Sequence, residues 1–171
     1  MADVRIVFEP HAPESLRQHV RDHLDSYNVA VTGRDDWTPV TFLLRGPHDE
    51  VVGGLLGNIW GGWMHVAILW VSERFRGRGH GRALLRAAEA LARERGCANA
   101  HLDSFSFQAP GFYEKLGYEE FAVLEDFPPG HSHHYFRKRL GPAPGAPGRR
   151  PPAGQRGGSG RTTIRKRPSG R

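Results

Sequence analysis

The 171-residue sequence lacks cysteine pairs, long apolar runs and a targeting sequence, and each absence excludes a class of protein. It has one cysteine, Cys97, so no disulfide can form within the chain, which is typical of a reducing compartment. No apolar run approaches the roughly 20 residues of a membrane-spanning helix, so we expect no membrane association. Residues 1–4 do not begin a signal or transit peptide. We therefore expect a cytoplasmic protein.

Acidic residues are missing altogether from residues 141–171. This stretch carries eight of the 24 basic residues, so residues 1–140 hold 16 basic against 18 acidic residues, a net charge of −2. The stretch consists mainly of Pro, Gly, Arg and Ser, and Ile164 is its only large apolar residue. Such a segment cannot bury enough surface to offset its chain entropy. We expect one domain at residues 1–140 and a disordered basic tail at residues 141–171.

The basic tail allows an alternative role in binding nucleic acid or an acidic partner, because its uncompensated charge attracts polyanions. It has no interleaved aromatic residues on which bases could stack. We therefore favour a solubilising extension over a nucleic-acid-binding segment.

The stretch VSERFRGRGHGR at residues 71–82 carries the main functional signal. An apolar run at residues 65–71 leads into it, and residues 83–95 follow with leucine and alanine at helical spacing. Alternating glycines let the chain turn tightly between the two. A strand, a glycine-rich turn and a helix N-terminus together point several unpaired backbone N–H groups at one place. The stretch therefore predicts a site for a phosphate-bearing cofactor.

Two common phosphate-binding motifs do not fit these glycines. A P-loop needs Lys-Ser or Lys-Thr after its last glycine, and neither follows Gly81. The dinucleotide fingerprint G-x-G-x-x-G is out of step with Gly77, Gly79 and Gly81. That fingerprint also usually opens its fold, whereas several predicted strands precede this loop.

The pattern Arg76-x-x-Gly79-x-Gly81 resembles the Q/R-x-x-G-x-G/A pyrophosphate loop of the GNAT superfamily of acetyl-CoA-dependent N-acetyltransferases. A second stretch, SFQAPGFYEKLGY at residues 106–118, resembles the family signature A-x-x-F-Y-x-K-x-G-F/Y. The two stretches occur in the family's order, with room for one helix and one strand between them. Two motifs in order are more specific than either alone. The sequence thus resembles a bacterial-type, single-domain GNAT over about residues 1–140.

Hydrophobic patterning agrees with the mixed α+β fold that the resemblance implies. Alternating apolar runs predict strands, helical spacing predicts helices, and Gly and Pro mark the turns. The predicted order is β-α-βββ-α-β-α-β-β, a mostly antiparallel sheet flanked by helices. Strands are expected at residues 4–8, 37–45, 51–60, 63–71, 100–105, 118–124 and 132–139, and helices at residues 14–26, 81–95 and 110–116.

The resemblance also implies which residues hold acetyl-CoA, the expected co-substrate. Amides of the glycine-rich stretch would bind the pyrophosphate, and nearby arginines would add positive charge. Backbone at the end of the preceding strand would receive the pantetheine arm and polarise the thioester carbonyl. The expected cofactor-binding residues are Trp70, Val71, Arg76, Gly77, Arg78, Gly79, His80, Gly81, Arg82, Phe107 and Gln108.

Acetyl transfer to an amine needs an acid for the departing thiolate. Tyr113 stands in the Phe-Tyr pair of the second motif, where the family places a tyrosine beside the cofactor sulfur. The resemblance therefore implies that Tyr113 is this acid. The alternative is a packed core aromatic.

The transfer also needs a base for the amine proton. His65 lies eleven residues before Arg76, where family members often carry a base, and imidazole titrates near neutrality. Strand alternation would put His65 on one face with Ala67 and Leu69, and Val66, Ile68 and Trp70 on the other. Ala67 stands where many members have an acid, which argues against a direct carboxylate mechanism. A structural role for His65 is the alternative.

Two carboxylates are further candidates for the base. Glu73 is the nearest to the strand that carries His65, although it could instead pair with Arg74 or Arg76. Asp103 lies on the adjoining predicted strand.

We expect neither a metal nor a cysteine nucleophile. His131 and His133 would share a strand face while His134 points away, and no Cys or carboxylate spacing completes a metal site. Cys97 follows the predicted helix end, away from both motifs, so transfer would proceed directly in a ternary complex.

The amine acceptor is a small molecule or a peptide that the sequence does not specify. Its binding wall is expected from residues 28–36, the Trp60–Trp63 hairpin and residues 126–134. Dimers are common in the resembled family, so a homodimer is one expected state. A GNAT scaffold that binds CoA without turnover is the alternative function.

Overall fold

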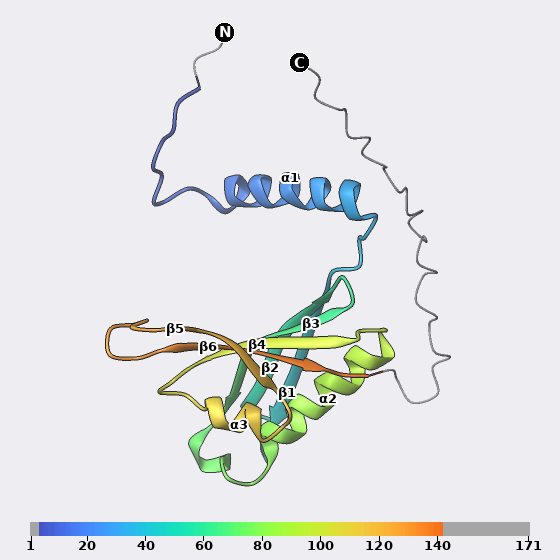
Figure 1. The fold of residues 1–171 in the computed structure, drawn as a ribbon, viewed down its shortest axis with the longest axis vertical. Coiled ribbons are helices and arrows are strands. Elements are labelled where there is room, and N and C mark those ends of the chain that lie inside the picture. The colour runs from blue at the N-terminus through green and yellow to red at the C-terminus, as the bar shows by residue number, and fades with distance from the viewer. Residues whose placement is uncertain (1–3, 142–171) are drawn as a thin grey trace, which may run out of the picture.

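The computed structural model describes residues 4–141. A six-stranded mixed sheet in the order β1-β2-β3-β4-β6-β5 forms the body, α2 and α3 lie below it in Figure 1, and α1 lies above. The strands are β1 (Thr38–Arg45), β2 (Val51–Trp60), β3 (Trp63–Val71), β4 (Asn99–Phe105), β5 (Glu119–Leu124) and β6 (His133–Arg139). The helices are α1 (Glu14–Thr32), α2 (His80–Glu94) and α3 (Pro110–Glu114), with a 3-10 turn at Glu73–Phe75. The predicted α+β class is confirmed.

The core lies between α2 and one face of the sheet. Leucine and alanine side chains recur along α2 every three or four residues, which gives the helix one apolar side. This side packs on inward-facing residues of the strands, including Leu55, Met64 and Phe136, which are fully buried. Packing of this kind fixes the start of α2, and with it the glycine-rich loop, against the end of β3.

Strand β3 contains a β-bulge at Ala67. In its antiparallel pairing with β2, Leu56 lies opposite Ile68 but Gly57 lies opposite Val66, so Ala67 has no partner in β2. The extra residue resets the alternation of side chains. Val66 and Leu69 face the core, whereas His65 and Ile68 share the open face with Trp70. The predicted faces of β3 were therefore wrong, because strict alternation does not hold across a bulge.

Strands β3 and β4 separate at this bulge. They pair in parallel only from Trp63–Asn99 to Val66–Leu102, while every other pairing in the sheet is antiparallel. Strand β3 then continues to Val71 beside β2, and β4 continues to Phe105 beside β6. The sheet therefore opens between the C-terminal halves of β3 and β4.

The N-terminal region differs most from expectation. Residues 4–9 form no strand, and their apolar side chains are exposed, as Ile6 and Phe8 illustrate. A strand needs a hydrogen-bonding neighbour, and no strand of the described chain pairs with this segment. Helix α1 extends to Thr32, beyond the predicted end at residue 26, and Gly33 caps it in the left-handed conformation with φ of 66°.

The remaining strands and helices begin and end within two residues of their predicted limits. The Trp60–Trp63 hairpin is present, and positive φ angles at Gly61 and Gly62 make its tight turn. Residues 28–32, which were expected in the wall of the acceptor site and outside any helix, belong to α1. The predicted tail at residues 141–171 lies outside the described residues except for Gly141.

The bulge depends on the absence of a side chain at Gly57. A Cβ atom at this position would overlap the His65 carbonyl oxygen of the neighbouring strand. We expect Gly57→Ala to lower the free energy of unfolding by about 1–3 kcal/mol, measured by urea denaturation. Gly111→Ala is the matched control, because its Cβ would meet only one carboxylate oxygen at 3.9 Å. Equal stability of the two variants would contradict this account of the bulge.

Candidate active site

The glycine-rich loop between β3 and α2 has the geometry of an anion site. Gly77 and Gly79 adopt φ angles of 73° and 85°, which side chains other than glycine rarely accept. Gly79 directly precedes α2, no side chain caps the helix, and no acid lies in its first turn. The first N–H groups of α2 therefore have no partner within the helix and point toward the loop. Their partial positive charge favours an anion at this position.

The arginines of the loop are partly engaged within the protein. The Nε of Arg76 donates a hydrogen bond to the Val71 carbonyl oxygen at 2.9 Å. The Arg78 guanidinium lies 5.9 Å from the centre of the Phe75 ring. Arg76 thus ties the loop to the end of β3. Arg82, in contrast, is exposed in the first turn of α2.

The two sequence motifs meet in space. A Cβ at Gly81 would lie 3.5 Å from the Phe112 ring, so the start of α2 packs closely against α3. The neighbouring Tyr113 is buried between Phe112, Tyr118 and Phe136, with ring centres 5.1 to 6.1 Å away. Burial raises the pKa of the Tyr113 hydroxyl, and the Asp103 carboxylate raises it further. Tyr113 therefore keeps its proton throughout the neutral range.

A pair of histidines lies on the open face of the sheet, before the point where β3 and β4 separate. The rings of His65 and His101 stack at 4.5 Å, with an interplanar angle of 10°. The Nδ1 atom of His65 lies 3.4 Å from Asn58 Oδ1. Together with Trp60 and Trp63 they line a shallow hollow at the hairpin. Burial lowers the pKa of His101, and His65 lowers it further while Asp103 opposes the shift.

Asp103 forms a second polar cluster on the same face. Its Oδ2 lies 2.7 Å from Nε2 of His133, and the Tyr135 hydroxyl lies 3.3 Å from Nδ1 of the same ring. A neutral ring that donates from Nε2 to the carboxylate leaves Nδ1 to accept from Tyr135. The ring is further held by stacking on Phe105 at 4.1 Å. Asp103 is the first residue of β4 beyond the pairing with β3.

The sequence named Asp103 and His133 separately but did not predict their contact. They lie 30 residues apart on strands whose register brings Asp103 opposite Tyr135, the residue two after His133. Only the register of β4 with β6 could have predicted this pair.

Other expected site residues lie outside the opening or have structural partners. The Glu73 side chain is 87% exposed in the 3-10 turn, 3.7 Å from Arg76. Gln108 Oε1 accepts hydrogen bonds from the Phe105 N–H at 2.9 Å and the Ser104 hydroxyl at 3.3 Å. Phe107 stacks on Phe105 at 5.2 Å. Gln108 thus closes the turn after β4, and Trp70 and Val71 lie at the open edge of β3.

Residues 4–141 contain no group of three or more His, Cys, Asp or Glu side chains placed to hold a metal. Cys97 is buried, and this burial raises the pKa of its thiol. Within the same range, no helix has the length and apolar character needed to cross a membrane.

Comparison with known proteins decides the family. Residues 8–118 match the sequence family described as the acetyltransferase (GNAT) family. The chain belongs to the GNAT family of acetyltransferases. It is 33% identical over 137 residues to an acetyltransferase from Agrobacterium fabrum, covering 80% of this chain and all of that protein. It is 44% identical over 96 residues to the blasticidin-S acetyltransferase of Streptomyces morookaense, covering 56% of this chain and 71% of that protein.

Solved structures agree with this assignment. The crystal structure of an acetyltransferase from Agrobacterium tumefaciens has a TM-score of 0.75 and 33% identity, covering 80% of this chain and 99% of that one. An acetyltransferase from Bacillus cereus has a TM-score of 0.68 and 35% identity, covering 78% of this chain and 97% of that one. The GNAT fold of this acetyltransferase is thus established along most of the described residues.

The lowered pKa of His101 predicts a pH-dependent stability. Below its usual pKa near 6.5, the unfolded chain binds a proton at this ring more readily than the folded protein does. The free energy of unfolding should therefore fall as the pH drops below about 6.5. We expect His101→Gln to flatten this decline in urea titrations at pH 5 to 8, and His48→Gln, in the exposed β1–β2 turn, to leave it unchanged. An unaltered slope in His101→Gln would exclude this residue as a cause.

Proposed function

We propose that this GNAT acetyltransferase binds acetyl-CoA in the opening between β3 and β4 and transfers its acetyl group directly to a primary amine. The observation that carries the proposal is the bulge at Ala67. It coincides with the end of β3–β4 pairing, and β3 then leads directly into the anion-binding loop. Unpaired backbone of β3 and unpaired N–H groups at the start of α2 therefore lie next to each other. This arrangement suits an extended ligand that carries a pyrophosphate.

The proposed cofactor contacts follow from this arrangement. Backbone N–H groups from Gly77 to Arg82 would hold the pyrophosphate, with charge added by Arg78 and Arg82. Backbone of Trp70 and Val71 at the unpaired edge of β3 would bind the pantetheine arm. An N–H group near the bulge would donate a hydrogen bond to the thioester oxygen, which gains negative charge as the amine attacks.

The reaction needs two proton transfers, one to the departing thiolate and one from the amine, and each can be assigned to one residue. The amine nitrogen forms a bond to the thioester carbon, and the carbon–sulfur bond then breaks. We propose that the Tyr113 hydroxyl gives its proton to the departing thiolate, since its raised pKa keeps it protonated. The proton lost by the amine passes to the Asp103 carboxylate, and His133 orients that carboxylate through the 2.7 Å contact.

Asp103 is favoured over His65 as the base because of its place in the sheet. It stands beyond the last pair of β3 and β4, and its charge acts on Tyr113. His65 lies before the opening and stacks on His101, so it suits the wall of the acceptor site. The exposed Glu73 is not proposed for proton transfer.

The acceptor is proposed to be a small-molecule amine. The relative named as a blasticidin-S acetyltransferase supports this class, since the two chains are 44% identical over 96 residues. The hollow lined by Trp60, Trp63, His65 and His101 offers flat rings to such an acceptor. Blasticidin S is therefore the first compound to test, beside polyamines, amino acids and a lysine peptide.

Binding of the cofactor can be tested by calorimetry with acetyl-CoA and desulfo-CoA. We expect both to bind, and Gly79→Asp with Gly81→Asp to abolish binding, because two carboxylates would repel the pyrophosphate. Gly96→Asp is the control for strain, since Gly96 also has a positive φ but lies after α2. Undiminished binding by the folded double variant would place the cofactor elsewhere.

The two proton-transfer roles predict matching kinetic losses. Tyr113→Phe and Asp103→Asn should each lower kcat by about 10²- to 10⁴-fold while the affinity for acetyl-CoA is kept. Thiol release with the best acceptor of the panel measures the rate. In the same assay, His65→Gln serves as the comparison: it should mainly raise the KM for the acceptor. Wild-type turnover in Tyr113→Phe would exclude this hydroxyl as the acid.

A further inference from the structure

Helix α1 carries an apolar stripe that no other part of residues 4–141 covers. Its apolar side chains recur every three or four residues, so they share one side of the helix. Each is between 49% and 68% exposed, and no residue of α1 is buried. The stripe consists of Leu16, Val20, Leu24, Tyr27 and Val31. A soluble protein rarely leaves so long an apolar surface in water.

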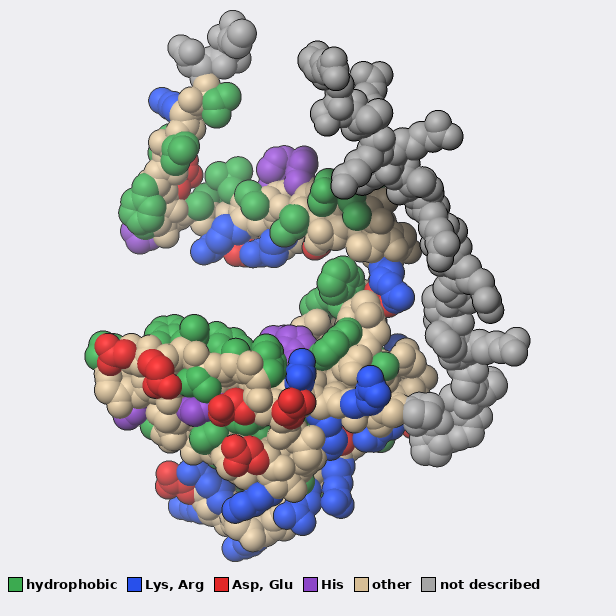
Figure 2. All heavy atoms as spheres, in the orientation of Figure 1, with side chains coloured by type: hydrophobic (Ala, Val, Ile, Leu, Met, Phe, Trp, Pro, Cys, Tyr) green, Lys and Arg blue, Asp and Glu red, His purple; other side chains and the backbone are tan. Residues whose placement is uncertain are grey.

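The open face of the sheet carries a matching apolar patch. Register places Leu43 and Trp70 on either side of Gly54, and Leu56 beside Ile68. These four side chains are 40% to 52% exposed, because α2 packs on the opposite face. Figure 2 shows the wide gap between this face and α1. The described residues therefore carry two uncovered apolar surfaces of complementary form. The stripe on α1 is a ridge, and the patch on the sheet is a flatter face.

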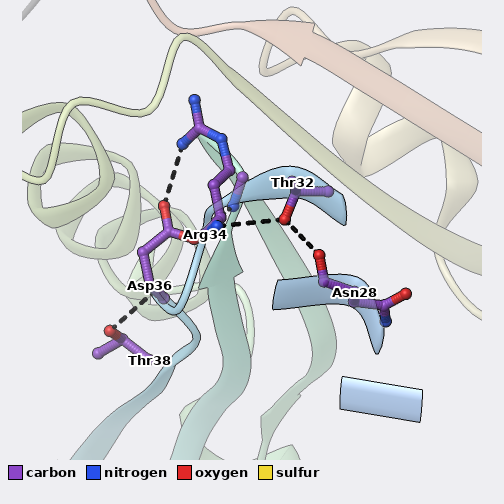
Figure 3. Close-up of polar contacts among 6 residues, drawn as sticks. Asn28, Thr32, Arg34, Asp36 and Thr38 are labelled. Carbon is purple, nitrogen blue, oxygen red and sulfur yellow. Dashed lines mark hydrogen bonds and ion pairs between the residues drawn. The ribbon is translucent and has the colours of Figure 1, made fainter. Parts of the chain in front are cut away.

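The linker between α1 and β1 directs the helix away from its own sheet. Only residues 33–37 separate the two elements. The Thr32 hydroxyl donates to the Asn28 carbonyl oxygen at 2.6 Å and accepts from the Arg34 N–H at 3.2 Å (Figure 3). Arg34 in turn pairs with Asp36 at 3.2 Å, and Asp36 accepts a hydrogen bond from the Gly61 N–H at 3.2 Å.

These contacts tie the linker to the end of α1 on one side and to the turn between β2 and β3 on the other. In Figure 2, blue basic side chains lie on the side of α1 that faces the sheet, and green apolar ones lie mainly on its other sides. The stripe is therefore presented outward. With the linker in this conformation, the side of α1 that faces its own sheet is the basic side and not the stripe.

We propose that two copies of this chain exchange their N-terminal segments, so that the α1 stripe of each copy lies on the open sheet face of the other. The exchange is reciprocal and closes as a two-fold dimer, because each copy offers one stripe and one patch. It covers both apolar surfaces without altering the linker. The patch adjoins Ala67 and His65, so the helix of the second copy would also border the proposed acceptor site.

The first test is the mass of the full chain in solution, by size-exclusion chromatography with light scattering. Exchange predicts a dimer of about 38 kDa, twice the 19.1 kDa of one chain. Val20→Glu with Leu24→Glu should shift the protein to the monomer mass with its helical circular dichroism kept. The matched control is Gln18→Glu with Ser26→Glu, which adds the same charge outside the stripe and should stay dimeric. A monomeric wild type, or equal behaviour of the two variants, would overturn the proposal.

A cross-link distinguishes exchange from folding back within one chain. Cys97 is buried and is the chain's only cysteine, so a cysteine pair introduced by Val20→Cys and Ile68→Cys would be the reactive one. Treatment with a short bismaleimide should give a covalent dimer on a denaturing gel. Gln18→Cys with Ile68→Cys, on the far side of the helix, should give little. A cross-linked species that runs as a monomer would show that α1 covers its own sheet and would overturn the proposal.

Discussion

The opening between β3 and β4 depends on one residue of β3 that has no partner in β2. Ala67 has no partner in β2, and the parallel pairing of β3 with β4 ends at the residue before it. A bulge in one strand turns its backbone and side chains relative to the neighbouring strands. Here it frees the β4-facing edge of β3 while the pairing with β2 continues to Val71. Gly57 must lack a side chain for β2 and β3 to fit together at the bulge, so the opening depends on this glycine as well.

The packing of α2 and α3 turns this opening into a two-sided site. The core side of α2 fixes its N-terminus at the end of β3, and Phe112 lies against Gly81 at the same place. Tyr113 is thereby buried beside the loop, and its environment raises the pKa of its hydroxyl. On the other side, β6 supplies His133, which holds the Asp103 carboxylate. In the proposed mechanism the loop amides would bind the pyrophosphate, the Tyr113 hydroxyl would give a proton to the thiolate, and the Asp103 carboxylate would take one from the amine.

The loop and its helix could be predicted from the sequence because both depend on local signals, alternating glycines before an apolar repeat of helical spacing. The predicted faces of β3 were wrong because an insertion in strand register leaves no trace in the alternation of residues 65–71. The contact of Asp103 with His133 depends on long-range pairing of two strands, which no local pattern contains. Residues 4–8 have the composition of a strand, but no strand among the described residues pairs with them, so strand propensity alone gave a wrong prediction there. Whether Tyr113 and the glycine-rich amides act as proposed stays a prediction.

The most direct test of the account is an NMR titration of the amide signals with CoA. If the opening beside the bulge is the cofactor site, the largest shifts should fall on residues 67–71 and 77–82, two segments that are joined only by the turn after β3. Amides of the β1–β2 turn and of β5 should hardly move. Shifts concentrated away from the end of β3 and the start of α2, or none at saturating CoA, would contradict the claim that strand separation at Ala67 creates the site.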